Sequence, residues 1–117
     1  MNIIIMVNAS PWGSSLATTA LRFVEAAGSA GHDISAVYFR GDGIYNMLEG
    51  PLSDDSLPPM KQAWAELAER RGFKLLLCSS DCARRVPEAV FDNTVASQAG
   101  LARWWQLAGE SDRMVSF

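Results

Sequence analysis

Apolar residues in the first part of the chain fall into two alternating patterns. Residues 2–7 (NIIIMV) form an unbroken apolar run rich in β-branched side chains, which is typical of a strand buried on both faces of a parallel sheet. A polar turn follows, and residues 14–27 then place apolar side chains at the spacing of a helix with one buried face. Residues 32–39 (HDISAVYF) predict a second strand. The connection between the two strands is long enough for a right-handed parallel crossover.

The same alternation continues to the end of the chain. Apolar runs predict further strands at 73–77, 90–97 and 112–117, of which the last alternates polar and apolar residues as an edge strand does. Helices are expected at 59–71, at 99–108 and, as a short segment ended by a proline, after Cys78. We therefore expect a three-layer α/β/α fold, one domain over residues 1–117, with about five mostly parallel strands.

Composition narrows the class of protein. Ten Lys and Arg residues against thirteen Asp and Glu give a net charge of −3, which argues against direct binding to nucleic acid because phosphate contacts need a basic surface. No apolar segment approaches the roughly 20 residues needed to cross a membrane, and the N-terminal segment does not have the pattern of a signal peptide. Two cysteines are too few for a disulfide framework. We expect a cytoplasmic protein with reduced thiols and no membrane partner.

The candidate chemistry is concentrated in the stretch KLLLCSSDCARR, residues 74–85. Cys78 ends a predicted strand, and reactive groups of open α/β sheets lie beyond the carboxyl ends of strands. A helix capped by Ser79, Ser80 or Asp81 would place free backbone N–H groups beside the sulfur and favour the thiolate. Arg84 would add positive potential, whereas the Asp81 carboxylate would oppose a second negative charge. Alternatively, Cys78 is a small apolar residue that finishes a buried strand; its position alone does not decide.

Cys82 follows at C-x3-C spacing, which differs from the C-x-x-C of thioredoxin-like sites. On one helix the two Cβ atoms would lie about 5–6 Å apart, farther than the roughly 3.5–4.5 Å of a disulfide. A resolving thiol and a packing residue both remain open for Cys82. No metal site is indicated, because structural zinc takes four ligands and His32 is the only histidine. Neither G-x-G-x-x-G nor a Walker lysine is present, so no organic cofactor is indicated.

Two further segments indicate surfaces for other proteins. Residues 40–59 are rich in Gly and Pro over twenty positions, a length without regular structure that usually belongs to a functional loop. We expect Tyr45, Met47 and Leu48 to be exposed there, as a docking loop beside Cys78. Trp104 and Trp105 are adjacent on a predicted helix and point about 100° apart. One of the two should therefore be exposed or covered by another subunit.

The ordered combination of these segments resembles the DsrE/TusD family of small sulfur-relay proteins. The shared features are the first strand, an aromatic-Gly-Ser turn, an Ala-rich helix, Gly-His before the second strand and FRGDGIYN after it. The strand KLLLC and the closing DRMVSF extend the likeness over most of the chain. The resemblance implies a flavodoxin-like layered fold and a sulfurtransferase that needs no cofactor. Of the family's functional residues, only the reactive cysteine carries over, as Cys78.

The family resemblance also implies a mechanism and partners. Cys78 would accept sulfane sulfur from a donor protein as a persulfide and pass it to an acceptor protein. Such proteins serve 2-thiolation of the tRNA wobble uridine or sulfur oxidation, and they assemble with sibling subunits into homo- or hetero-oligomers, trimers or hexamers. Two alternatives remain: a non-catalytic partner subunit of such an oligomer, in which Cys78 only packs, and a thiol–disulfide switch between Cys78 and Cys82.

Overall fold

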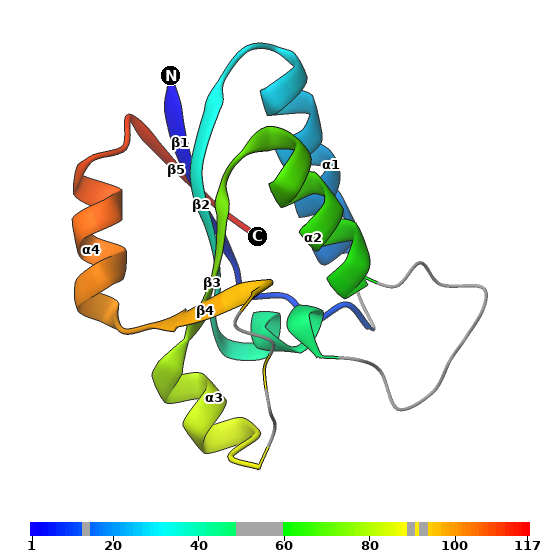
Figure 1. Ribbon diagram of the computed structural model, residues 1–117, viewed down its shortest axis with the longest axis vertical. Coiled ribbons are helices and arrows are strands. Elements are labelled where there is room, and N and C mark those ends of the chain that lie inside the picture. The colour runs from blue at the N-terminus through cyan, green and yellow to red at the C-terminus, as the bar shows by residue number, and fades with distance from the viewer. Residues whose placement is uncertain (13–14, 49–59, 89–90, 92–93) are drawn as a thin grey trace.

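A five-stranded, all-parallel sheet organises the molecule, with its strands in the order β4-β3-β2-β1-β5 (Figure 1). The computed structural model describes residues 1–12, 15–48, 60–88, 91 and 94–117. The strands are β1 Asn2–Val7, β2 Asp33–Phe39, β3 Lys74–Cys78, β4 Ala96–Ala99 and β5 Arg113–Ser116. The helices are α1 Leu16–Ser29, α2 Met60–Arg71, α3 Ser79–Arg85 and α4 Leu101–Gly109, with a 3-10 helix, η1, at Gly41–Met47. The predicted α/β fold with about five strands is confirmed.

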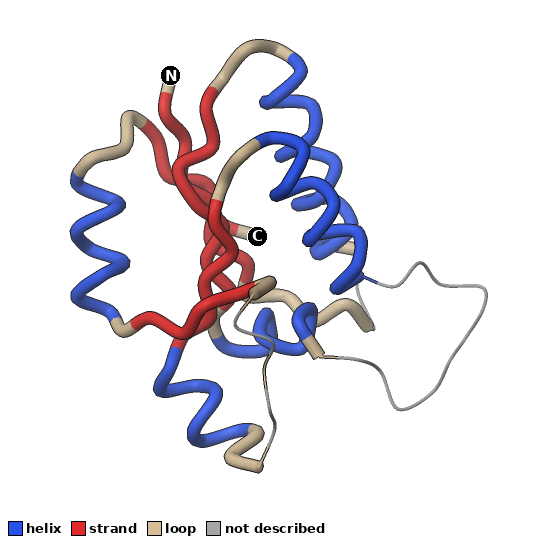
Figure 2. The backbone as a smooth tube through the Cα atoms, viewed as in Figure 1, coloured by secondary structure: helices blue, strands red, loops and turns tan. Residues whose placement is uncertain are grey.

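The connections explain which face each helix covers. Strands β1 to β4 follow one another in one direction across the sheet, and the chain then returns to place β5 on the far side of β1. Parallel crossovers are right-handed, so reversing the direction of the step moves the connecting helix to the opposite face. Accordingly, α1 and α2 lie on one face and α4 lies on the other (Figures 1 and 2). α3 covers neither face and extends from the carboxyl end of β3 (Figure 1).

Side chains of the strands divide between two apolar clusters. The larger cluster lies on the α1/α2 face and includes Leu75 and Leu77 of β3. The smaller one lies on the α4 face and includes Leu76 and Cys78. The alternation follows from the two-residue period of a strand, and it fixes the side of the sheet on which the Cys78 sulfur lies.

The predicted loop at 40–59 is partly a compact helical turn. η1 packs against the end of β1, where the Arg40 N–H donates to the Val7 carbonyl oxygen at 3.0 Å. A Cβ atom at Gly43 would lie only 1.9 Å from that same oxygen, so the close approach requires glycine. The Asn46 side chain donates to the carbonyl oxygens of Ala9 and Gly43, at 2.9 Å each. These bonds hold residues 41–47 in place, whereas positions 49–59 of the predicted loop lie outside the described residues.

The fourth strand lies later in the chain than its apolar pattern predicts. The expected range, 90–97, covers positions 90, 92 and 93 outside the described residues, while β4 runs from Ala96 to Ala99. β4 is an edge strand with exposed Ser97 and Gln98, so it lacks the apolar run of an inner strand. The apolar residues that suggested a strand, Phe91 and Val95, pack against the larger cluster from outside the sheet.

Candidate functional site

The candidate site forms where β3 passes directly into α3. Cys78 is the last residue of β3 and occupies the N-cap position of α3, with extended backbone angles (φ −64°, ψ 113°). Ser79 and Ser80 therefore lie inside the first turn, so the expectation that one of them caps the helix is wrong. The strand needs no connecting turn because the chain changes direction at Cys78 itself. The Cys78 side chain makes no capping hydrogen bond to that turn.

The Cys78 thiol is buried, with 4% of the residue exposed. Its side chain belongs to the cluster under α4, together with Tyr38 and Trp104. In the sheet, Cys78 pairs with Ala99, the last residue of the edge strand β4. Neighbouring segments of the chain therefore cover the sulfur.

Two polar side chains, Tyr38 and Asp81, lie in the elements that surround Cys78. The first is Tyr38, which packs in the same cluster as Cys78 and whose hydroxyl donates to the Ala99 carbonyl oxygen at 3.0 Å. Its ring stacks in a tilted arrangement on Trp104, with 5.2 Å between ring centroids. Burial and the neighbouring Cys78 raise the pKa of Tyr38 above its ordinary value. Tyr38 is therefore a neutral hydrogen-bonding group at the site.

The second is Asp81, a buried carboxylate in the first turn of α3. Its Oδ2 accepts the Gly41 N–H at 2.8 Å, and its Oδ1 accepts from Arg84 Nη2 at 3.1 Å. Burial by itself raises the pKa of Asp81, but the Gly41 bond, the nearby Cys78 thiol and the arginines outweigh it and lower the pKa below its usual value. Asp81 is therefore ionised near neutral pH, on the helical turn that begins at Cys78.

Arginine side chains link α3 to η1 around this carboxylate. Arg84, the predicted accessory residue, is mostly exposed and pairs with Asp81 rather than with the sulfur. Arg85 lies 3.9 Å from the Asp81 carboxylate through its Nε and pairs with Asp42 of η1. The positive charges next to the site are thus partly neutralised by carboxylates.

Cys82 lies one turn after Cys78 but packs on the opposite side of the sheet. It belongs to the larger cluster, is 3% exposed, and is a free thiol, as is Cys78. Burial, followed by the charges of Cys78 and Asp81, raises the pKa of Cys82 to about 11. A resolving role for Cys82 stays a prediction, and both its burial and its raised pKa work against it.

The predicted docking residues separate into buried and half-buried side chains. Met47 packs into the larger cluster, so the expectation that it is exposed is wrong; the hydrogen bonds that hold η1 against β1 direct it inward. Tyr45 and Leu48 are half-buried and pack against the same cluster. Tyr45 also contacts the exposed Trp12, with 5.8 Å between ring centroids. Their docking role stays a prediction.

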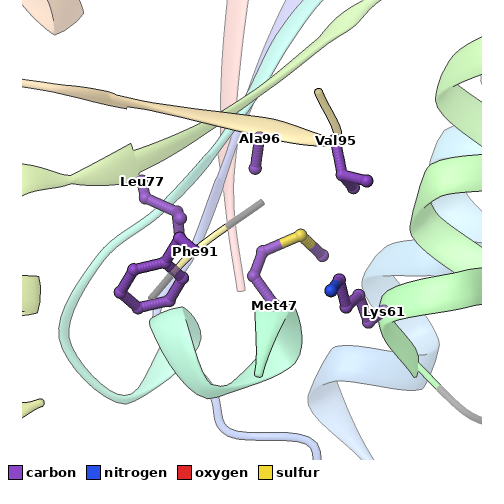
Figure 3. Close-up of a pocket in the computed structure, with 6 residues that line it drawn as sticks. All are labelled: Met47, Lys61, Leu77, Phe91, Val95 and Ala96. Carbon is purple, nitrogen blue, oxygen red and sulfur yellow. The ribbon is translucent and has the colours of Figure 1, made fainter. Parts of the chain in front are cut away.

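A shallow apolar hollow lies near η1 (Figure 3). It is lined by Met47, Lys61, Leu77, Phe91, Val95 and Ala96. Leu77 and Cys78 are consecutive in β3 and point to opposite faces, so this hollow does not lead to the sulfur.

Two features of the described residues bear on metal binding and on membrane insertion. Among these residues, no three His, Cys, Asp or Glu side chains come together as a metal site would require. None of the described helices combines the length and the apolar character that a membrane span needs.

Comparison with known proteins adds to this geometry. A family model described as DsrE/DsrF-like matches residues 1–117. The chain belongs to the DsrE/DsrF-like family. Among its DsrE/DsrF-like relatives, sulfurtransferase TusD of Salmonella newport (strain SL254) is 33% identical over 103 residues, which are 86% of this chain and 77% of that protein. Sulfurtransferase TusD of Enterobacter sp. (strain 638) is 33% identical over 104 residues, 87% of this chain and 77% of that protein.

A solved structure shares the fold. The crystal structure of the ychN protein from E. coli matches with a TM-score of 0.80 over 100% of this chain and 99% of that chain. The sequence identity is 18%, so this likeness concerns the layered arrangement of strands and helices alone. The resemblance to the DsrE/TusD family is confirmed at the level of the family.

Sequence reasoning missed Tyr38 as a member of the site and gave Asp81 only the role of a helix cap or an opposing charge. A signal for Tyr38 was available, because it pairs with Leu76 of β3, two residues before Cys78, and so shares the face of the sulfur. For Asp81 the missing information was the contact with Gly41, forty residues away in sequence. No local pattern predicts that contact.

Proposed function

We propose that this protein is a sulfurtransferase subunit of a sulfur relay, in which Cys78 accepts sulfane sulfur as a persulfide and passes it to a downstream carrier protein. The observation that carries the proposal is the place of Cys78 at the β3–α3 junction, with Tyr38 in its cluster and the buried Asp81 on the turn that follows it. A cysteine that served only packing would gain nothing from two polar groups beside it. Membership of the family, and relatives named sulfurtransferase, support the same chemistry.

The proposed loading step is a displacement at sulfur. The Cys78 thiolate attacks the terminal sulfur of a donor persulfide, R–S–SH; the new S–S bond forms as the donor's S–S bond breaks. The donor leaves as a thiolate and takes up the proton that Cys78 lost, so R–S–SH and Cys78–SH become R–SH and Cys78–S–SH. Delivery repeats the exchange with an acceptor thiol as the nucleophile. Thiolate fraction and access set both rates, and no metal or organic cofactor takes part.

Because Cys78 is 4% exposed, transfer requires its cover to open. The cover consists of Trp104 of α4 and the edge strand β4. An edge strand is hydrogen-bonded on one side only, so moving it disturbs fewer bonds than moving an inner strand would. We propose that a donor or acceptor protein docks at the carboxyl end of β3 and drives the movement. Tyr45 and Leu48 of the predicted docking loop are half-buried beside it; Met47 is buried and is not proposed.

The family and the exposed side chains support a proposal about the assembly and location of the protein. We propose that residues 1–117 form one domain, act in the cytoplasm and assemble with sibling subunits into a homo- or hetero-oligomer, a trimer or hexamer. Trp105 is 68% exposed, and Leu101 and Met114 are exposed as well, which is unusual for a surface that faces only water. The relay would serve tRNA wobble-uridine 2-thiolation or sulfur oxidation through protein partners, without direct contact with nucleic acid or membrane.

The burial of Cys78 and the exposure of Trp105 together favour a second candidate. In this alternative the chain is a non-catalytic partner subunit of a DsrE-type oligomer, in which Cys78 packs and the region around Trp105 contacts a sibling. This candidate predicts no stable persulfide on any cysteine.

Intact mass after incubation with a persulfide donor tests the proposal. The wild type should gain one sulfur atom that a reductant removes; Cys78→Ser should not gain it, and the matched control Cys82→Ala should. No gain in the wild type, measured also in the presence of its sibling subunits, would reject sulfur transfer and favour the partner subunit. A loss of two hydrogen atoms with no sulfur added would instead indicate a disulfide between Cys78 and Cys82.

A further inference from the structure

Tyr38 ties the cover of Cys78 to the middle of the sheet. It belongs to β2, which pairs with β1 on one side and with β3 on the other, and it is fully buried. Its hydroxyl donates to the Ala99 carbonyl oxygen at 3.0 Å, and its ring stacks on Trp104 with 5.2 Å between ring centroids. One side chain of an inner strand therefore contacts both parts of the cover, the edge strand β4 and the helix α4.

The junction at which β4 passes into α4 is a weak point of this cover (Figure 1). Ala99 is the last residue of β4, and its pair with Cys78 is the last of the β3–β4 register, a position that opens more readily than the middle of a sheet. Gly100 follows with an extended backbone, and a Cβ atom there would lie 3.9 Å from Ser79 Oγ. The Trp104 N–H donates to the Gly100 carbonyl oxygen at 3.3 Å, so the first turn of α4 is linked to any movement of this junction.

We infer that Tyr38 is a positioning residue that controls access to Cys78: the bond from its hydroxyl to Ala99 holds the β4–α4 junction closed over the sulfur, and breaking it exposes the thiol while the sheet stays folded. The inference rests on the proposed function in one respect, since a sulfur donor and an acceptor must both reach the thiol. A hydrogen bond between a hydroxyl and a carbonyl oxygen is neutral and contributes only modestly to stability. The resting thiol thus stays covered, and a docked partner has to displace the junction alone.

The test is the rate at which iodoacetamide alkylates Cys78 in the folded protein, in a Cys82→Ala background so that one thiol reports. Tyr38→Phe keeps the ring that stacks on Trp104 and removes the hydroxyl. We expect the rate to rise about fivefold at every pH of the profile, because one hydrogen bond contributes a factor of this order to an opening equilibrium. A change in the ionisation of the thiol would instead move the midpoint of the profile. A rate that is unchanged or lower, or a profile whose midpoint alone moves, overturns the inference.

Ile3→Val in the same background is the matched control for stability. Ile3 is buried in the larger cluster, on the other face of the sheet from Cys78. The loss of one methylene group there should lower the free energy of unfolding about as much as the loss of the Tyr38 hydroxyl does. Its alkylation rate should nevertheless stay within about a factor of two of the parent's. Equal acceleration by the two substitutions would mean that global unfolding exposes the thiol, which contradicts the inference.

A second measurement keeps the inference testable should Tyr38→Phe not fold. In the folded Cys82→Ala protein, the alkylation rate at low urea should depend on urea concentration much less steeply than global unfolding does, because opening of the junction exposes little surface. A dependence as steep as that of global unfolding would overturn the inference. Neither measurement uses a sulfur donor, so failure of the Tyr38 role and failure of the proposed function are distinguishable.

Discussion

The two cysteines lie four residues apart, are almost equally buried, and have different surroundings. Cys82 packs among apolar side chains under α1 and α2, where burial raises its pKa to about 11. Cys78 lies on the α4 face, at the end of a strand, with a hydroxyl and a carboxylate near its sulfur. Exposure alone therefore does not distinguish the two thiols. The polar groups that accompany the sulfur do.

The largest expected difference between the two thiols is in their rates of alkylation in the folded protein. With a pKa of about 11, Cys82 is ionised to only about one part in 10⁴ at pH 7. We expect iodoacetamide to modify Cys78 of the native protein, and Cys82 only after unfolding in urea. Both cysteines lie in the tryptic peptide 75–84, so fragment-ion mass spectrometry must assign the label. Equal rates at the two sites would contradict the proposed distinction.

The two adjacent tryptophans lie on the inner and outer surfaces of α4, so substituting each one compares the two surfaces. Trp104 is buried and stacks on Tyr38, whereas Trp105 is 68% exposed. Trp104→Ala should therefore lower the free energy of unfolding by about 3–5 kcal/mol, measured by urea denaturation. Trp105→Ala should change it by less than about 0.5 kcal/mol. Similar losses of unfolding free energy in the two variants would show that Trp104 is not the residue that packs α4 against the sheet.

Alkaline pH should reveal the burial of Cys82 as a loss of stability. Below about pH 9 the thiol is protonated in both the folded and the unfolded state, so its contribution to stability is fully present. Between about pH 9 and 11 the unfolded state releases the proton while the folded state retains it, so the free energy of unfolding falls by roughly 2–3 kcal/mol.

Comparison with Cys82→Ala isolates this contribution from that of Tyr38, which titrates in both proteins. Urea denaturation of both proteins at pH 8 and pH 11 gives the difference in stability between them. As the pH rises, the wild type should lose stability relative to Cys82→Ala. A constant difference would mean that Cys82 is not buried as described.

The smallest expected effect concerns the single hydroxyl that ties β2 to β4. Tyr38→Phe removes the donor to the Ala99 carbonyl oxygen and should lower the free energy of unfolding by about 1 kcal/mol. Tyr45→Phe provides a reference at a half-buried position. If Tyr38→Phe is as stable as the wild type, the cover of Cys78 does not depend on this bond.

Sequence alone predicted most of the fold because the strands and long helices have strong, regular apolar patterns. The exception among the strands was β4, an edge strand whose exposed Ser97 and Gln98 give it no apolar run. The exposure of one of Trp104 and Trp105 was also predictable, since neighbours on a helix cannot both face one core.

The site was predictable only in part. The place of Cys78 at the end of β3 followed from the pattern around it, but its burial and its partners did not. Tyr38 reaches the site across the sheet, and Gly41 meets Asp81 through the packing of η1 on α3. Contacts between segments this far apart depend on the completed fold, so local spacing does not encode them. Met47 was misjudged for the same reason, because hydrogen bonds elsewhere in η1 turn it inward.

Gly43 has a consequence for the chain's tolerance to change. The Val7 oxygen occupies the space where any other amino acid at this position would carry its first side-chain carbon. Even alanine would push η1 away from β1. The Gly41 N–H, two residues earlier, would move with it and lose its hydrogen bond to the Asp81 carboxylate. A mutation that touches neither cysteine would thereby shift the carboxylate on the helix that begins at Cys78, through one added methyl group.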